Sequence, residues 1–167
     1  MKKIDIREIA NKIRKCSFKE NIKWFLGMKG SSSKIALSVA LGLFIGLTIP
    51  MGLQSIVIIP LSLILDCNIV LALLATLISN PVTIIPIYFI AIKIGELFTP
   101  LSIQWERISL VLSKPTFQSL FDLGKEGIIL ILLGTFIMGI VTSALSYIII
   151  LKAIIVYRKR NSSLLNN

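Results

Sequence analysis

The polar residues that could do chemistry lie at two interruptions of otherwise apolar runs. These residues are Pro50, Gln54, Ser79, Asn80, Pro81 and Thr83. In hydrocarbon an unpaired backbone group is costly, so broken backbone persists only against protein or beside a hydrated cavity. Free amide groups and polar side chains at such breaks are how several transporters bind anionic groups. The six residues are therefore predicted to form either a substrate-binding site or a structural motif.

Chemistry that needs histidine or paired acids is not indicated. The chain has no histidine, which removes the usual Ser-His arrangements and most zinc sites. Cys16 and Cys67 lack any metal or redox spacing and are interpreted as free thiols. Asp66 is the only charged residue between Lys34 and Lys93, which makes it a candidate proton or cation relay, although its DCN context also fits an interfacial turn. We therefore predict no enzyme activity, metal or cofactor; a catalytic site shared with a second protein stays as the alternative.

The elements that must position these residues are short apolar helices. The chain has 167 residues, 55% of them hydrophobic, and a mean hydropathy of +0.89, too apolar for a soluble domain. Pro50 and Gly52 interrupt the first run, and Pro81 disfavours helix at the preceding residue, so that Thr83 is expected to N-cap the next helix. The resulting pieces span 35–47, 53–65, 69–78 and 82–94. A helix of about 13 residues is roughly 20 Å long, too short to cross a hydrocarbon core of about 30 Å.

We predict an all-α integral membrane protein built from short broken or re-entrant helices, one long C-terminal transmembrane helix and an N-terminal amphipathic helical segment. Its parts are a basic amphipathic segment (1–34), a core (35–95) with breaks at 48–55 and 79–83, an amphipathic connector (96–126), a transmembrane helix (127–157) and a basic tail (158–167). Small residues are interpreted as helix-packing positions. These are Ala36, Ser38, Ala40, Gly42 and Gly46 in the core, and Gly134, Gly139, Ser143 and Ala144 in the last helix.

The distribution of charge predicts the orientation of the chain. Residues 1–34 hold ten basic and three acidic residues, 158–160 are all basic, and 96–126 hold three basic and four acidic residues. By the positive-inside rule both termini are cytoplasmic, in a multi-pass protein of the bacterial inner membrane. The basic N-terminal segment is expected to bind anionic lipid headgroups rather than nucleic acid. Residues 35–94 then cross an odd number of times: a re-entrant hairpin over 35–65 plus one broken crossing is preferred, and three short crossings are the alternative.

The core carries a family resemblance. Gly42, Phe44, Ile45, Gly46, Pro50 and Gln54, then Asn68, then SNPVT at 79–83 resemble the bacterial family catalogued as domain of unknown function 2062. The resemblance implies a small bacterial inner-membrane protein and supplies no activity. More loosely, the broken hairpins resemble the re-entrant segments of DedA-type membrane proteins, which are associated with carrying polyprenyl-phosphate lipids, although the acidic and arginine residues of those motifs are missing here.

Two functions follow from these patterns. In the first, the protein is a carrier or flippase whose breaks meet to form a polar site for a small solute or lipid headgroup, with Gln54, Asn80 and Thr83 as ligands. In the second, it is a non-catalytic assembly subunit, a homo-oligomer or a partner of another membrane protein, and the breaks are packing devices. Hydration of Gln54 and Thr83 distinguishes the two, because packing contacts should be dry.

Overall fold

The computed structural model describes residues 30–104, 106, 108–109 and 124–165. In this part of the chain the helices are α3 (Ser32–Thr48), α4 (Gln54–Ile64), α5 (Ile69–Thr76), α6 (Ile84–Phe98) and α9 (Gly124–Leu165), and there is no strand. The all-helical prediction is confirmed. The N-terminal amphipathic segment predicted for 1–34 lies almost wholly outside the described residues, as does much of the connector.

Within the residues that the structure describes, one helix has the length and composition of a membrane span, as the sequence predicts. It is α9, whose segment Gly124–Arg160 covers 37 residues with a hydropathy of 2.5. This helix begins before residue 127 and continues through the basic residues Arg158, Lys159 and Arg160 to Leu165. The other helices are short: α3 has 17 residues, α4 has 11, α5 has 8 and α6 has 15.

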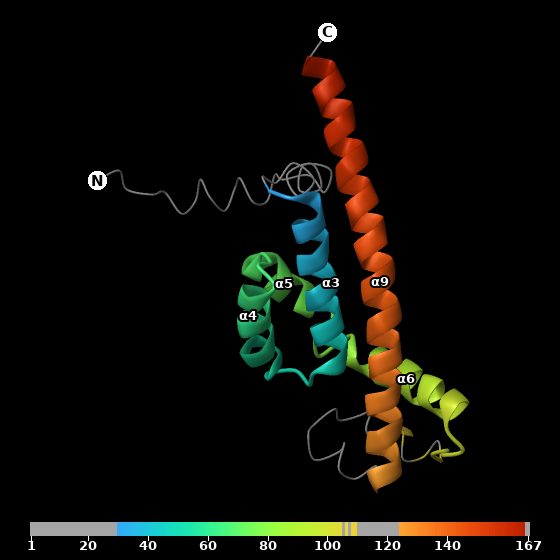
Figure 1. The fold of residues 1–167 in the computed structure, drawn as a ribbon. Helices are drawn as coiled ribbons and strands as arrows, with labels where there is room; N and C mark the ends of the chain where they lie inside the picture. The colour runs from blue at the N-terminus through green and yellow to red at the C-terminus, as the bar shows by residue number, and fades with distance from the viewer. Residues whose placement is uncertain (1–29, 105, 107, 110–123, 166–167) are drawn as a thin grey trace, which may run out of the picture.

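The helices run up and down beside α9 before the chain turns across it. α3 lies along α9 in the opposite direction, α4 and α5 form a hairpin beside α3, and α6 passes across the first half of α9 (Figure 1). Because α3, α4 and α5 alternate in direction, the turn between α4 and α5 lies at the end of the bundle where α3 begins. The breaks after α3 and after α5 both lie at the opposite end.

Two glycines allow the closest approaches between helices. A side chain at Gly42 would meet the backbone carbonyl oxygen of Ala72, so this position lets α3 pack directly on α5. A side chain at Gly134 would meet the backbone of Ala91, where α6 crosses α9. These contacts agree with the predicted packing role of both residues.

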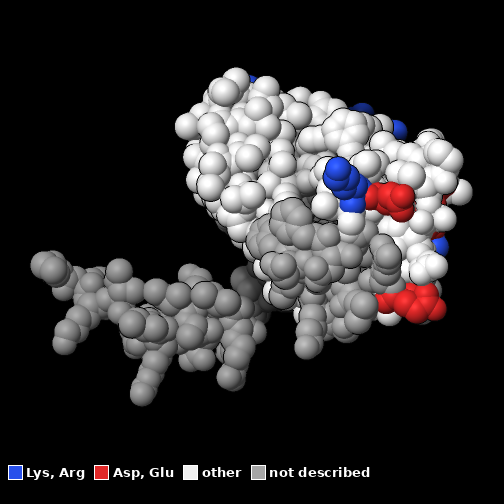
Figure 2. Space-filling view, turned by 90° about the horizontal axis from the view of Figure 1, so that it is seen from below, with Lys and Arg blue, Asp and Glu red and all other residues white. Residues whose placement is uncertain are grey.

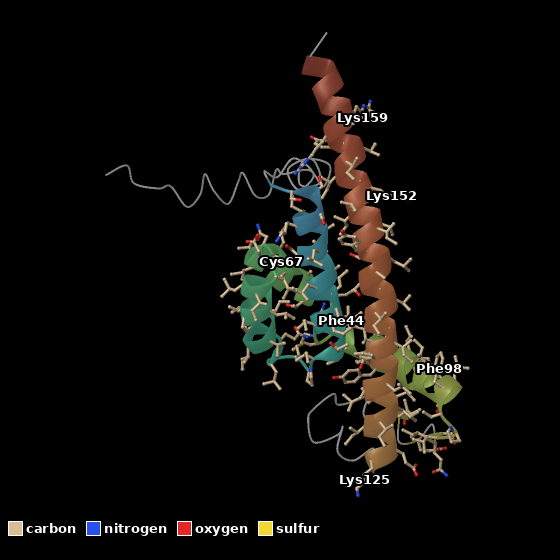
Figure 3. The ribbon with its side chains drawn as sticks, in the orientation of Figure 1. Phe44, Cys67, Phe98, Lys125, Lys152 and Lys159 are labelled. Carbon is tan, nitrogen blue, oxygen red and sulfur yellow. The ribbon has the colours of Figure 1, made fainter. Side chains whose placement is uncertain are left out.

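Apolar clusters hold the helices together, and apolar side chains also cover much of the outer surface. Between α6 and α9 lie Tyr88, Ile92, Leu130 and Ile131, with Ile108 beyond α6. Ile45, Ile58 and Ala72 join α3, α4 and α5. On the outside, Ile56 and Ile64 of α4 and Ile149 of α9 are 70%, 78% and 65% exposed. Figure 3 places Lys125 and Lys159 near the two ends of α9, and Figure 2 shows the face seen from the Lys125 end as largely uncharged.

Candidate functional site

The two predicted breaks meet. Gln54 opens α4 directly after the first break, and Ser79 lies in the second break, between α5 and α6. The side-chain nitrogen of Gln54 donates a hydrogen bond of 2.7 Å to the Ser79 hydroxyl oxygen. Both residues are 7% exposed, so this contact, 25 positions apart in the sequence, is a buried junction between the breaks.

Gln54 also closes the end of α3. Its side-chain nitrogen lies 3.1 Å from the carbonyl oxygens of both Gly46 and Ile49, which belong to the last turn and the C-cap of that helix. The last carbonyls of a helix have no partner within it, so a side-chain donor beside them satisfies groups that would be costly to leave bare in an apolar setting. The amide nitrogen of Gln54 is therefore engaged by the protein itself.

Asn80 and Thr83 satisfy one another in the second break. The Asn80 side-chain oxygen accepts from the backbone N–H groups of Val82 (2.9 Å) and Thr83 (3.1 Å). In return the Thr83 hydroxyl accepts from the backbone N–H of Asn80 (2.9 Å) and donates to the carbonyl of Ile78. This is the reciprocal pattern of a capping box, with Pro81 at the first helical position, where its missing N–H costs nothing.

This pattern corrects the predicted role of Thr83. Thr83 occupies the position before α6, but its side chain makes no capping bond to that helix. Its backbone is already helical, with φ −83° and ψ −18°, so the chain turns into the helix earlier, at Asn80. The backbone bond from Ile84 N to Asn80 O, 2.9 Å, continues that turn. The capping residue is Asn80, and Thr83, three residues later in the sequence, accepts a hydrogen bond from the Asn80 backbone N–H.

Asp66 lies away from the junction, in the turn between α4 and α5. Its carboxylate is 2.9 Å from the ammonium group of Lys34, which also donates to the Leu65 carbonyl at 3.2 Å. The Asp66 side chain is 89% exposed, and its φ of 51° is a turn conformation. The geometry is that of an exposed turn, with no contact from Asp66 to Gln54 or Thr83.

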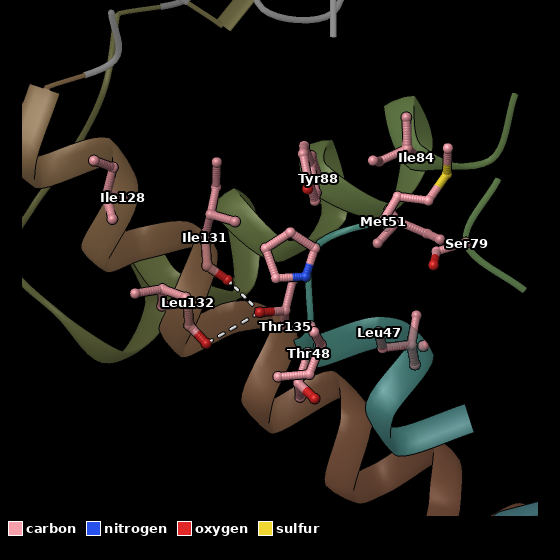
Figure 4. A pocket seen from close by; sticks show the side chains of 14 residues that line it. Leu47, Thr48, Met51, Ser79, Ile84, Tyr88, Ile128, Ile131, Leu132 and Thr135 are labelled. Atoms are coloured by element: carbon pink, nitrogen blue, oxygen red, sulfur yellow. Dashed lines mark hydrogen bonds between the residues drawn. The ribbon is translucent and has the colours of Figure 1, made fainter. Parts of the chain in front are cut away.

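A cavity of about 230 Å³ adjoins the junction. Side chains from α9 face those of α3, α6 and the first break across it (Figure 4). The lining residues are Gly46, Leu47, Thr48, Ile49, Pro50, Met51, Ser79, Ile84, Ile87, Tyr88, Ile128, Ile131, Leu132 and Thr135. No charged residue is among them, so the cavity suits an apolar occupant.

The few polar groups of the cavity differ in what they contact. The Thr135 hydroxyl donates to Ile131 O at 2.7 Å, and the Thr48 hydroxyl donates to Phe44 O at 2.7 Å, so both are engaged with their own helices. Ser79 accepts from Gln54. Tyr88 is 8% exposed, and its hydroxyl has no hydrogen-bond partner within the described part of the chain. Tyr88 is thus the one lining side chain here whose polar atom stays available.

The structure brings some predicted residues together and separates others. Pro50, Gln54 and Ser79 share the junction or its cavity, whereas Asn80, Pro81 and Thr83 form a local turn. Two polar roles were missed. Asn68 caps α5 by accepting from Leu71 N (3.1 Å), and Ser38 accepts from Asn68 N (2.7 Å). Ser38 therefore does more than allow close packing. An Asn directly before an apolar run is an N-cap signal that was available in the sequence.

Outside the junction, Glu96 makes an electrostatic contact near the end of α6. It lies beyond the apolar part of α6 and accepts from Lys93 Nζ at 2.8 Å and from Ile103 N at 3.3 Å. The hydrogen bond from Lys93 holds the pKa of Glu96 below its ordinary value of 4.5. Within the described ranges no three His, Cys, Asp or Glu side chains come together as metal ligands.

Comparison with known proteins agrees with the resemblance seen in the sequence. Residues 15–163 match the family described as "Uncharacterized protein conserved in bacteria (DUF2062)". No curated protein and no solved structure matches the chain. Since the match covers most of the 167 residues, the chain belongs to the DUF2062 family of bacterial proteins.

Proposed function

We propose that the chain is a multi-pass subunit of the bacterial inner membrane, with α9 as one crossing and both termini cytoplasmic. The uncharged part of α9 runs from residue 127 to 151, about 37 Å at 1.5 Å per residue, enough for a hydrocarbon core of about 30 Å. Arg158, Lys159 and Arg160 follow it, and the positive-inside rule favours the cytoplasm for that end. Gly30, where the described chain begins, accepts a hydrogen bond of 2.8 Å from Arg158 and so lies at the same end.

The proposed re-entrant hairpin consists of α3 and α4. Ile35 packs with Ile154 near the cytoplasmic end of α9, and Thr48 lies against Gly139, the middle of the uncharged stretch. α3 therefore reaches about half the depth of the membrane before it breaks. α4 then returns to Asp66, which is held beside Lys34 at the start of α3.

The proposed broken crossing consists of α5 and α6. α5 descends from the Asp66 turn to the second break at the depth of the first. α6 continues past α9, with Ala91 beside Gly134 and Gly95 beside Leu130, and ends toward the side where α9 begins. One re-entrant hairpin and one broken crossing satisfy the odd number of crossings that the charge distribution requires.

The function that this arrangement favours is that of a non-catalytic assembly subunit, in which the breaks are packing devices. The observation that carries the proposal is the engagement of Gln54 by Gly46, Ile49 and Ser79. A solute site would need these groups free, whereas here they bind each other in a buried junction. The apolar outer surface is left to contact lipid, a second copy or another membrane protein. The basic segment 1–34 is proposed to bind anionic headgroups.

Aqueous accessibility of single cysteines tests this proposal. After replacement of Cys16 and Cys67, cysteines at Gln54, Ser79 and Asp66 are exposed to membrane-impermeant thiol reagents from each side. We expect labelling at 66 from the cytoplasmic side only and protection at 54 and 79 from both sides. Ser55, which is exposed on the next position of α4, is the matched control for the substitution at 54. Labelling at 54 and 79 would instead reveal water at the junction and reject the packing role.

A carrier is the second candidate, favoured by the cavity beside the junction. Asn80→Ala and Thr83→Val separate the two functions. Either variant opens the capping box at the start of α6 and should lower accumulation in the membrane whichever function holds. A carrier that uses these side chains as ligands should in addition lose transport per inserted molecule, whereas an assembly subunit should show the lower accumulation alone.

A further inference from the structure

The cavity beside the junction opens sideways onto the apolar surface of the protein. Met51 of the first break and Leu132 of α9 both line it, and they are 40% and 55% exposed. Leu132 also belongs to the exposed apolar face of α9. The lining therefore continues into the outer apolar surface of the protein, which faces hydrocarbon in the proposed membrane placement.

The depth of the cavity matches one leaflet. Its α9 lining runs from Ile128 to Thr135, within the third of the uncharged stretch nearest Lys125. In the proposed orientation this is the outer leaflet, from the edge of the hydrocarbon to near its middle. The molecules available at that depth are lipid chains.

The size and chemistry of the cavity select a chain over a headgroup. Apolar cavities of about 150 Å³ stay dry and bind benzene, so about 230 Å³ accommodates a longer hydrocarbon segment. A phosphate would require basic side chains, and none lines the cavity. Tyr88, whose hydroxyl has no partner among the described residues, packs with Leu130 and Ile131, and these two residues lie about 5 Å inside the end of the uncharged stretch of α9. An ester carbonyl lies at this depth when its acyl chain extends toward the membrane centre.

We propose that the cavity binds one acyl chain of an outer-leaflet phospholipid, with its ester carbonyl accepting a hydrogen bond from Tyr88. The lipid stands between α9 and the first break, so it closes the side of the junction that faces the membrane. The inference rests on the membrane placement proposed above, and it assigns a ligand class to a cavity that the packing role alone leaves unused.

Native mass spectrometry of the delipidated full chain, titrated with dioleoyl phosphatidylcholine in detergent, tests the site. We expect one lipid to bind tightly; this lipid has no net charge, so its binding is separate from the anionic-headgroup binding proposed for the basic segment 1–34. Ile128→Trp fills the cavity and should weaken binding at least tenfold, while Ile129→Trp on the adjacent, outward-facing position should leave it unchanged. If far-ultraviolet circular dichroism shows that Ile128→Trp is unfolded, Met51→Trp replaces it, with exposed Leu53→Trp as its control.

Tyr88 gives the second arm. Tyr88→Phe should weaken binding of the ester-linked lipid by about fivefold, the worth of one hydrogen bond, and leave an ether-linked lipid of the same chains unaffected. Equal binding of dioleoyl phosphatidylcholine to wild type and Ile128→Trp would overturn the proposal. Binding of free oleate as tight as that of phosphatidylcholine, and weakened equally by Ile128→Trp, would assign the site to fatty acids and refute the phospholipid. The cysteine-labelling test of the packing role does not depend on lipid binding. If positions 54 and 79 are protected from labelling but no lipid binds, the lipid site is rejected and the packing role stands.

Discussion

Replacement of Gln54 by leucine tests whether the junction holds the two breaks together. Leucine has a similar volume and cannot donate, so Gln54→Leu leaves the carbonyls of Gly46 and Ile49 without their donor and removes the bond to Ser79. An amide nitrogen has two hydrogens, so three contacts amount to two full hydrogen bonds. Such bonds between membrane helices average about 0.6 kcal/mol and reach about 1.7, which predicts a loss of about 1–3 kcal/mol in the free energy of unfolding.

The assay is reversible unfolding in mixed micelles, followed by far-ultraviolet circular dichroism as the denaturing detergent increases. Ser55→Ala changes a neighbouring exposed residue and should alter stability by less than about 0.5 kcal/mol. Gln54→Asn should be as harmful as Gln54→Leu, because the shorter side chain cannot reach the same carbonyls.

A double-mutant cycle isolates the contact between the breaks. Ser79→Ala alone should cost about 0.6–1.7 kcal/mol, and the pair with Gln54→Leu should fall short of the sum by a similar amount, since both remove one bond. Strict additivity would show that Gln54 and Ser79 do not interact in the folded protein. A Gln54→Leu variant no less stable than Ser55→Ala would refute the reasoning about the whole junction.

Three more substitutions probe packing, the turn and the connector. Gly134→Ala should destabilise the protein by about 1–3 kcal/mol, because the new methyl group meets the backbone of α6. Gly139→Ala should lower the unfolding midpoint less than Gly134→Ala, because its methyl group meets side chains that can shift. Asp66→Asn should change stability by no more than about 1 kcal/mol and leave sided cysteine labelling intact, because the ion pair is exposed and Asn tolerates positive φ. Because Lys93 lowers the pKa of Glu96, the Glu96 carboxylate should stabilise the fold fully above pH 4.5, and this stabilisation should disappear as the pH falls through the lowered pKa. The unfolding midpoint of wild type should therefore fall over this pH range, and that of Glu96→Gln should not.

The sequence predicts where the helices break, because the signals are local. Pro50, Gly52 and Pro81 prevent regular helix wherever they are placed, and the long uncharged run of α9 requires no tertiary information. The sequence does not predict which groups meet at the breaks. Gln54 contacts Ser79 because the α4–α5 hairpin returns the chain to the end of the bundle where α3 stops. Hydrophobic periodicity in the sequence does not show that the chain returns there.

The cap of α6 is predictable from the local sequence, whereas the place of Tyr88 beside the cavity is not. Asn80 followed by Pro81 is the combination of N-cap and first helical residue, yet Thr83 was favoured as the cap because helix was expected to resume only after it. Tyr88 attracted no interpretation, since one tyrosine in a run of apolar residues does not reveal which face of α6 will border a cavity.

The two breaks meet the same physical requirement with opposite groups. The end of α3 leaves carbonyl oxygens, which need a donor, and Gln54 supplies an amide nitrogen. The start of α6 leaves N–H groups, which need an acceptor, and Asn80 supplies a carbonyl oxygen. A carboxylate at 54 could not donate and would face two carbonyls, so the residue type there follows from the helix end it closes. Breaks satisfied in this way can lie at the middle of a membrane without water, and the proposed re-entrant hairpin would therefore not by itself indicate a path for solutes.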